Sequence, residues 1–135
     1  MRTAMTCGIL VGMATAAWMF AEYALGFHEA GGIGRWTGFV ALIFLIAGAY
    51  LLARREHLPS YGRAAALGAA FGATGGIVNG VAIYGYFAWL NPGFTYDGQP
   101  TNAVTQAVSA FVGAVILGTL LVIVVRALRR QKEAL

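Results

Sequence analysis

A ladder of glycines constrains this chain more than any other feature of its sequence. Within residues 64–90, glycines recur at every fourth position, at Gly68, Gly72, Gly76 and Gly80. In water such a segment is a poor helix, because each interior glycine costs about 0.5–1 kcal/mol relative to alanine. In lipid the backbone must satisfy its own hydrogen bonds, so the segment stays helical, and the missing side chains let a second helix approach closely. We therefore expect residues 64–90 to form a central transmembrane helix, against which the other helices pack.

The composition of the chain favours a membrane protein. Of its 135 residues, 59% are hydrophobic and only 10% are charged, whereas a soluble domain carries roughly 25% charged residues. Three further apolar segments lie at residues 3–26, 36–53 and 102–125. Each is long enough, or nearly so, to span a hydrocarbon core of about 30 Å. The predicted fold class is an all-α, membrane-embedded bundle of four helices, in a single domain of residues 1–135.

The first apolar segment has a second interpretation as a signal peptide, because residues 14–16 are similar to a small-residue cleavage site. However, the apolar run continues through residues 18–20, and Arg2 is the only charge before it. We therefore expect the segment to remain in the protein as a helix. The single cysteine, Cys7, lies within it, which excludes an intramolecular disulfide.

The basic residues alternate from one side of the predicted membrane to the other. The N-terminus, the loop after the second helix and the tail at residues 126–135 hold all of them except Arg35. The positive-inside rule therefore places both termini in the cytoplasm. We expect the loop and tail residues to anchor the protein to anionic lipid headgroups, at Arg54, Arg55, Arg63, Arg126, Arg129, Arg130 and Lys132. No nucleic-acid recognition motif accompanies these residues, so we expect no nucleic acid partner.

Small and polar residues share the same helix faces. At 100° per residue, Asn79 and Tyr86 lie on one stripe with Gly72, and Gln106 shares a stripe with Gly113. Because polar groups that face lipid are costly, these stripes should turn into the bundle. The glycines expected to pack helices together are Gly8, Gly12, Gly68, Gly72, Gly76, Gly80, Gly113 and Gly118.

Polar side chains gather toward the outer ends of the predicted helices. One interpretation is an outward-facing polar pocket, lined by Glu22, His28, Asn79, Tyr86 and Gln106. The other is that these groups form hydrogen bonds between helices, while Glu22 reaches the nearby headgroups. The second arrangement is the commoner one in membrane proteins, and the sequence leaves both open.

The sequence contains no constellation that indicates an enzyme. His28 and His57 fall on opposite predicted sides of the membrane, and an outer metal site would have only Glu22, His28, Glu29 and Asp97 as ligands. No serine or cysteine lies beside a plausible base, and no ionisable group lies at mid-depth to carry protons. We therefore expect no catalytic residue, no metal and no cofactor.

The order of motifs resembles a bacterial family of small four-helix membrane proteins. Glu22 is followed by Gly26-Phe27-His28-Glu29, an apolar helix, a basic loop and a glycine-spaced helix that ends near Pro92-Gly93-Phe94. Over roughly residues 8–125 this arrangement is similar to the domain of unknown function 4199 family, whose first loop typically reads Gly-Leu-His-Asp. The resemblance implies four helices in the bacterial cytoplasmic membrane. It implies no activity, since none is assigned to the family.

Two functional hypotheses follow from the sequence. In the first, the chain is a non-enzymatic structural or accessory subunit, or a homo-oligomer, that assembles through small-residue stripes on its helices. Its partners are then the lipid bilayer and either further copies of itself or a larger membrane complex. In the second, the chain is a small transporter or channel with an outward-facing polar site around Glu22.

Overall fold

The computed structural model describes residues 1–29, 37–96 and 98–133. Its elements are α1 (Arg2–Ala24), α3 (Phe39–Arg55), α4 (Tyr61–Gly85), the π-helical turn η1 (Tyr86–Leu90), β1 (Thr95–Tyr96), β2 (Gln99–Pro100) and α5 (Ala103–Glu133). The two short strands pair antiparallel, with Thr95 opposite Pro100. The prediction of an all-α fold with four helices is confirmed for the residues that the structure describes.

Two polar side chains determine where the long helices begin. Ser60 Oγ accepts a hydrogen bond from the Arg63 backbone N–H at 3.1 Å, and α4 therefore begins at Tyr61, earlier than predicted. Asn102 Oδ1 accepts from the Thr105 backbone N–H at 3.1 Å, directly before α5. Serine and asparagine are favoured at this position because their side chains satisfy N–H groups that the helix itself leaves unpaired.

Helix α5 extends beyond its predicted end. Residues 126–133 continue the helix, although the apolar pattern ends at Val125. Arginine, lysine, leucine and glutamine all have high helix propensity, so nothing in this stretch terminates the helix. The second helix also differs from prediction, since α3 spans Phe39–Arg55, and the expected start at residue 36 lies outside the described residues.

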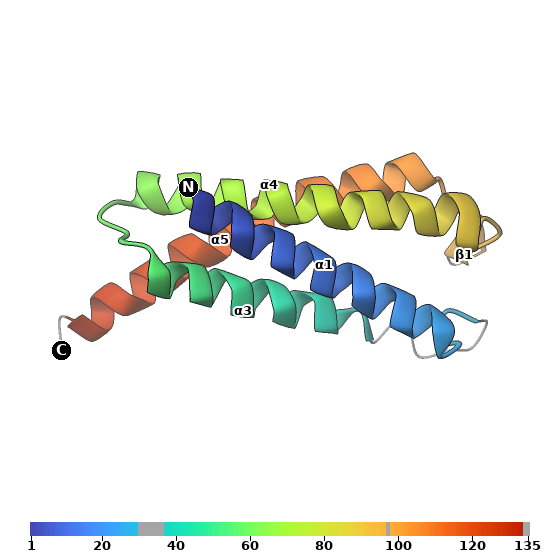
Figure 1. Cartoon of the computed structure of the whole chain (residues 1–135), viewed down its shortest axis with the longest axis horizontal. Helices are drawn as coiled ribbons and strands as arrows, with labels where there is room; N and C mark the ends of the chain where they lie inside the picture. Colours follow the sequence, from blue (N-terminus) through green and yellow to red (C-terminus); the bar gives the residue numbers. More distant parts are fainter. Residues whose placement is uncertain (30–36, 97, 134–135) are drawn as a thin grey trace.

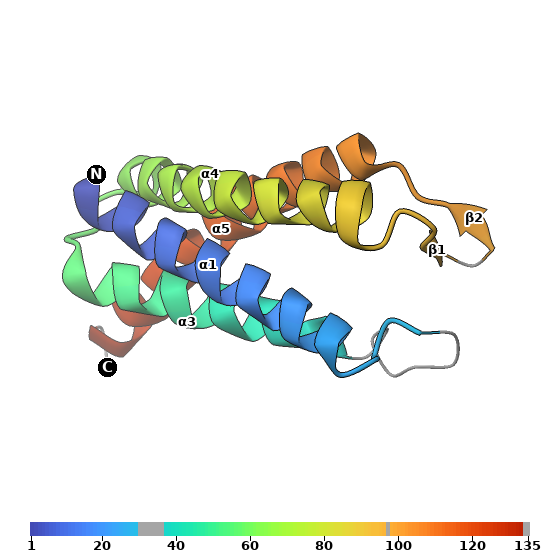
Figure 2. The same cartoon turned by 45° about the vertical axis from the view of Figure 1, so that its right-hand side comes forward.

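The helices form an elongated bundle with distinct ends. Both chain termini and the connection between α3 and α4 lie at one end, which we call the terminal end (Figures 1 and 2). The β1–β2 hairpin and the loop that follows α1 lie at the other, the hairpin end. Helix α4 packs most extensively on α5 and then on α1, whereas α3 packs mainly on α1 and α5. All three other helices pack against the glycine-rich one as expected, α3 through the Phe71 side chain beside Gly48.

Backbones of α4 and α5 touch along the glycine ladder. A side chain at Gly68 would place its Cβ 2.7 Å from Thr119 Cα, and one at Gly72 would place it 2.8 Å from Val115 Cα. From the opposite helix, a Cβ at Gly118 would lie 3.0 Å from Gly72 Cα. Backbone atoms cannot move aside as flexible side chains do, so these positions have room only for glycine.

A second close approach joins α1 to α4. A Cβ at Gly12 would lie 2.6 Å from the Gly75 carbonyl oxygen, and one at Gly8 would overlap Thr74 Oγ1 and the Phe71 carbonyl oxygen. Gly76 and Gly80 face α5 less tightly, with nearest atoms at 3.1 and 3.3 Å from such a Cβ.

Gly113 differs from the other predicted packing glycines. No atom lies within 4 Å of the position that a Cβ would take there. The residue instead lines a cavity of about 260 Å³ in the middle of the bundle, together with Thr15 and Asn79.

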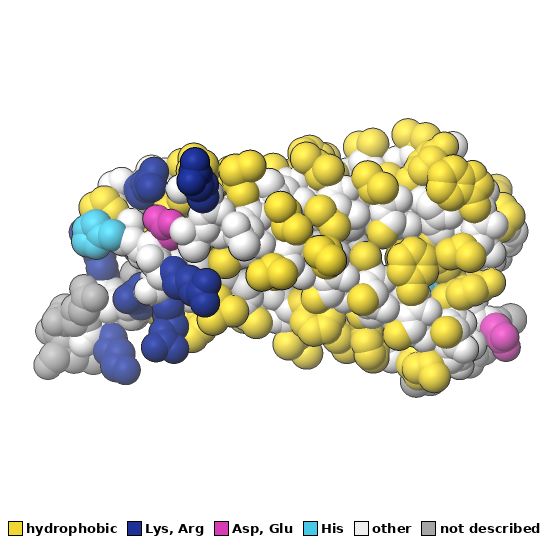
Figure 3. Space-filling model, in the orientation of Figure 1, with side chains coloured by type: hydrophobic (Ala, Val, Ile, Leu, Met, Phe, Trp, Pro, Cys, Tyr) yellow, Lys and Arg dark blue, Asp and Glu magenta, His cyan; other side chains and the backbone are white. Residues whose placement is uncertain are grey.

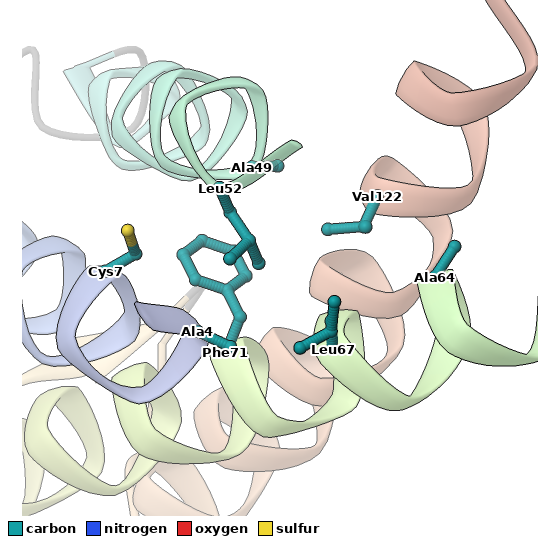
Figure 4. Packing of buried hydrophobic residues seen from close by; sticks show 8 residues of the cluster. All are labelled: Ala4, Cys7, Ala49, Leu52, Ala64, Leu67, Phe71 and Val122. Carbon is teal, nitrogen blue, oxygen red and sulfur yellow. The ribbon is translucent and has the colours of Figure 1, made fainter. Parts of the chain in front are cut away.

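The apolar core lies toward the terminal end and draws on all four helices (Figure 4). Its buried members are Ala4, Cys7, Ala49, Leu52, Ala64, Leu67, Phe71 and Val122. The Phe71 ring is 1% exposed and fills the space left by the missing side chain of Gly48, where a Cβ would lie 2.9 Å from the ring. Apolar packing thus closes the interior of the bundle toward the terminal end, while the cavity lined by Asn79 and the polar residues around Glu22 lie further along the bundle.

Large hydrophobic side chains are exposed along the outer surface of all four helices. Figure 3 shows hydrophobic side chains over most of one face, with Lys and Arg gathered at one end. Three segments are long and apolar enough to cross a membrane by length and composition, namely Arg2–Ala24, Tyr61–Leu90 and Ala103–Lys132. Helix α3 is shorter, at 17 residues.

Candidate functional site

The end of α1 folds back on itself through a glycine. Gly26 has a positive φ of 74°, its N–H donates to the Tyr23 carbonyl, and the Phe27 N–H donates to the Glu22 carbonyl at 2.9 Å. This pair of hydrogen bonds is the Schellman arrangement, in which a left-handed glycine satisfies the last carbonyls of a helix. As a result, the chain reverses and His28 lies over the last turn of α1.

Glu22 and His28 meet at this reversal. Glu22 is only 5% exposed, and its Oε2 lies 3.4 Å from His28 Nε2. The other carboxylate oxygen, Oε1, is buried without a hydrogen-bond partner among the described residues. Burying a carboxylate oxygen without a hydrogen-bond partner costs free energy, and this cost marks Glu22 as a candidate functional residue at the hairpin end.

The end of α4 supplies the opposite side of the site. The last turn, η1, is π-helical, and its end is closed by the Asn91 backbone N–H, which donates to the Tyr86 carbonyl at 2.8 Å. Tyr86 is 1% exposed, and its hydroxyl oxygen lies 2.6 Å from His28 Nδ1. The same oxygen accepts a hydrogen bond from Asn91 Nδ2 at 2.8 Å. Single π-helical turns of this kind occur frequently at functional sites.

One order of donors and acceptors satisfies this row of side chains. Because Asn91 donates to the Tyr86 oxygen, the Tyr86 hydroxyl can give its own proton to His28 Nδ1. The imidazole then carries its proton on Nε2 and presents it to Glu22 Oε2. This assignment follows from the donor and acceptor inventory, and it fixes the orientation of the His28 ring. We call the four residues Glu22, His28, Tyr86 and Asn91 the polar row.

A cavity of about 440 Å³ lies against the polar row. Its lining residues come from α1, the loop after it, the end of α4 and the start of α5, and they are Met19, His28, Ile83, Tyr86, Phe87, Phe94, Gln106, Ser109 and Ala110. Phe94 packs beside both Phe87 and His28, with ring centroids 5.6 and 6.2 Å apart. Apolar walls with a few convergent polar groups are the usual composition of a small-molecule site.

The structure brings together most of the predicted pocket residues. Glu22, His28 and Tyr86 form the polar row with Asn91, and Gln106 lines the same cavity as His28 and Tyr86. Asn79 is separate, because it lines the mid-bundle cavity, where its Oδ1 is buried without a partner in the described part of the chain.

Sequence reasoning missed two members of the site, Asn91 and Phe94. The run Asn91-Pro92-Gly93 indicates a turn, and a turn pattern does not predict what the asparagine side chain will contact. In the structure its amide donates to the Tyr86 hydroxyl oxygen. Phe94 belongs to the same turn, and a turn pattern says nothing of which ring it will contact.

The predicted headgroup anchors divide into two groups. Arg54, Arg55, Arg63, Arg129, Arg130 and Lys132 are exposed. Arg126 is only 3% exposed, and its Nε and Nη2 donate to the carbonyl oxygens of Leu58 and Pro59 at 2.9 and 2.8 Å, while its role as a headgroup anchor stays a prediction. The physical reason for its burial is the continuation of α5, which carries Arg126 past the connection between α3 and α4.

No group of three metal-ligating side chains comes together within residues 1–29, 37–96 and 98–133. Of the ligands considered for an outer metal site, Glu22 and His28 are in contact. Asp97 lies outside the described residues.

The fold and the site define a class of protein: a helical bundle with three helices of membrane-spanning length and a buried polar row at one end. The sequence profile of the family described as Protein of unknown function (DUF4199) matches residues 6–97, and the chain belongs to this family. The resemblance expected from the motifs is thus confirmed. The matched range includes Glu22, His28, Tyr86 and Asn91 and ends before α5. No curated protein and no solved structure matches the chain.

Proposed function

We propose that the chain is a non-enzymatic, multi-pass protein of the bacterial cytoplasmic membrane that binds a small solute in the cavity beside the polar row. The site faces the outer side, and the protein acts as a small carrier for that solute. The observation that carries this proposal is the convergence of His28, Tyr86 and Gln106 on one cavity, with the buried Glu22 behind His28.

The apolar exterior supports the membrane part of the proposal. Leu10 and Ile43 are each 61% exposed and Val81 is 69% exposed. Apolar patches on this scale lead to aggregation in water and match the hydrocarbon of a bilayer. Helix α3 would extend about 26 Å at 1.5 Å per residue, which is close to the thickness of a hydrocarbon core.

The charge distribution supports the orientation. Lys and Arg gather at one end of the bundle in Figure 3, the end that holds both termini in Figure 1. The positive-inside rule assigns that end to the cytoplasm. The hairpin end, with its cavity and polar row, then faces outward.

The chemistry of the cavity indicates the kind of solute. The rings of Phe87 and Phe94 offer an apolar surface, while His28, Tyr86 and Gln106 offer hydrogen bonds. A small molecule with an apolar body and one hydrogen-bonding group fits both. Glu22 contacts Nε2 of the His28 imidazole and so fixes the orientation of the ring that a bound solute would contact. The apolar core around Phe71 closes the interior of the bundle toward the terminal end, which favours a carrier that changes shape over an open channel.

A solute panel and one pair of variants test the proposal. The protein in mild detergent is screened for thermal stabilisation by small aromatic amines, alcohols and carboxylates, and any solute found is tested for flux in proteoliposomes. We expect Glu22→Gln to abolish both effects, because the neutral amide no longer offers a carboxylate to His28. Glu29→Gln is the matched control, since Glu29 is an exposed carboxylate in the same loop. A panel without any stabilising solute, or equal loss in both variants, would contradict the proposal.

An apolar groove favours a second candidate function, assembly of the chain with a second copy of itself. The groove has a volume of about 360 Å³ and lies between α4 and α5, with Gly76, Gly80, Ala107 and Phe111 among its lining residues. Ile77 and Val81 stand beside it, 57% and 69% exposed. Across a two-fold axis, the exposed Ile77 and Val81 of each copy can pack into the apolar groove of the other copy.

Disulfide trapping in the membrane tests the second candidate. Val81→Cys should give a covalent dimer in a background of Cys7→Ala, whereas Ile43→Cys, equally apolar and exposed on α3, should not. Dimer formation at both positions or at neither would exclude this interface. A chain that travels with larger subunits in mild detergent would instead indicate an accessory role in a membrane complex.

A further inference from the structure

Three arginines at the terminal end converge on the connection between α3 and α4. Arg126 donates to the carbonyl oxygens of Leu58 and Pro59, and Arg130 Nη2 also donates to Pro59 at 3.3 Å. Arg129 Nη1 donates to the carbonyl oxygen of Ala53, near the end of α3. All three arginines come from the part of α5 that extends beyond the apolar pattern.

These arginines line a cavity together with residues 56–59. Its volume is about 190 Å³, and it lies apart from the solute cavity, at the other end of the bundle. The wall includes the imidazole-bearing residue His57 in addition to the three guanidinium groups. The cavity is therefore a small, partly open space to which three guanidinium groups contribute, beside the apolar residues Leu58 and Pro59.

The positive charge at this cavity exceeds the negative charge. Glu56 also lines the cavity but pairs with Arg63 at 3.8 Å, and no carboxylate whose side chain the structure describes forms an ion pair with any of the three arginines. Arg126 is 3% exposed, and its Nη1 is buried without a hydrogen-bond partner among the residues that the structure describes. The ring of Tyr61, 3.9 Å from the guanidinium carbon, compensates the charge only in part.

A buried cation without an anion is costly, and proteins normally pair such a group. Carbonyl oxygens satisfy individual N–H groups of the arginines but leave their net charge. Several guanidinium groups around one small space are the arrangement that recognises phosphate oxygens, because each group presents its donors in a fixed planar fork.

We propose that the cavity formed by Arg126, Arg129, Arg130 and residues 56–59 binds one phosphate group. The group is either the phosphodiester of an anionic lipid headgroup or free phosphate. This differs from diffuse attraction between a basic surface and a membrane, since one anion occupies one defined position. It is also independent of the solute site at the hairpin end.

The test compares two arginines at the same end of the protein. Arg130→Gln removes a cavity-lining charge from an exposed residue, so the fold should tolerate it. Arg54→Gln removes the same charge from α3 outside the cavity, where the guanidinium lies 5.9 Å from the Tyr50 ring. If phosphate is held by diffuse electrostatic attraction, both variants bind it equally less tightly. If it occupies a defined site, only Arg130→Gln binds it less tightly.

Two probes distinguish the sources of phosphate. Native mass spectrometry measures retention of phosphatidylglycerol against phosphatidylcholine, and thermal unfolding in neutral detergent measures stabilisation by inorganic phosphate against chloride. We expect one bound phosphate group per chain, with affinity about tenfold lower in Arg130→Gln and unchanged in Arg54→Gln, as for the loss of one charge-assisted hydrogen bond. Binding of phosphatidylglycerol alone identifies a lipid headgroup, and binding of inorganic phosphate identifies the free ion. Equal losses in both variants, or no binding of either probe, overturn the proposal.

Discussion

The imidazole Nδ1 of His28 lies 2.6 Å from the hydroxyl oxygen of Tyr86, which is 58 residues further along the chain. Their rings also meet edge to face, with centroids 5.3 Å apart. This contact joins the loop after α1 to the last turn of α4, and both residues line the same cavity. The wall of the proposed solute site therefore depends on contacts between two distant segments, which also meet through the ring of Tyr23, whose centroid lies 5.5 Å from that of Tyr86.

Tyr86→Phe should loosen that wall. The substitution keeps the ring but removes the oxygen that contacts both His28 and Asn91, leaving His28 Nδ1 and Asn91 Nδ2, both on partly buried residues, without this partner. We expect a loss of about 1–3 kcal/mol in stability, together with faster hydrogen exchange in residues 26–29. Tyr84→Phe is the control, because Tyr84 is 41% exposed and its ring packs only on the edge of Trp89 in the described contacts. Equal behaviour of the two variants would show that the contact does not hold the loop.

Much of the fold follows from the sequence because its physics is local. The four-residue glycine spacing places Gly68, Gly72 and Gly76 on one helix face, and that face meets α5. The helix ends are less predictable from hydropathy. Capping by Ser60 and the helical continuation beyond Val125 depend on polar residues, which an apolar pattern does not register.

The site follows from the sequence only in part, because two of its properties are not local. Asn79 and Tyr86 share a stripe by angle, yet seven residues separate them by about 10 Å along a helix axis. They consequently line different cavities. The contact of His28 with Glu22 depends on the reversal at Gly26, and such a reversal is not visible in helical periodicity.

Gly72→Ala should separate α4 from α5. The added Cβ would overlap the Ala114 carbonyl oxygen and lie 2.8 Å from Val115 Cα, and neither backbone atom can move without shifting its helix. We expect a loss of about 1–3 kcal/mol or more, measured by thermal unfolding in detergent. Gly113→Ala adds the same methyl group to the facing helix, where no atom lies within 4 Å. That variant should be neutral or up to about 1 kcal/mol more stable, since alanine favours a helix; equal destabilisation would refute the packing described for Gly72.

Gly26→Ala should disturb the reversal that carries His28. At a φ of 74°, an alanine is strained by about 1–2 kcal/mol. Gly26→Asn should be milder, because asparagine tolerates this conformation better. Gly93→Ala serves as the control, since it has no positive φ and no atom within 4 Å of a Cβ. Limited proteolysis of the loop after α1 provides the measurement, and cleavage that is no faster in Gly26→Ala than in Gly93→Ala would contradict this role.

Arg126→Lys should weaken the attachment of α5 to the connection between α3 and α4. A lysine keeps the positive charge but cannot reproduce two donors in one plane to Leu58 and Pro59. We expect a loss of about 1.5–3 kcal/mol in unfolding free energy, the range for hydrogen bonds of charged groups. The matched change Arg55→Lys, at an exposed arginine of the same end, should have little effect. Unfolding curves in a denaturing detergent compare the two variants, and overlap of the curves would contradict a stabilising role of the Arg126 hydrogen bonds.

The proposed orientation of the bundle in the membrane predicts which of its ends an impermeant thiol reagent reaches. Cys7 is buried, and its replacement by alanine provides a background free of thiols. In that background, Thr95→Cys at the hairpin end should react in intact cells, because the end poor in Lys and Arg faces outward under the positive-inside rule. Gln131→Cys, on the exposed last turns of α5, should react only after the membrane is made permeable. The reverse pattern would place the cavity in the cytoplasm, and the solute site would then have to be loaded from inside the cell.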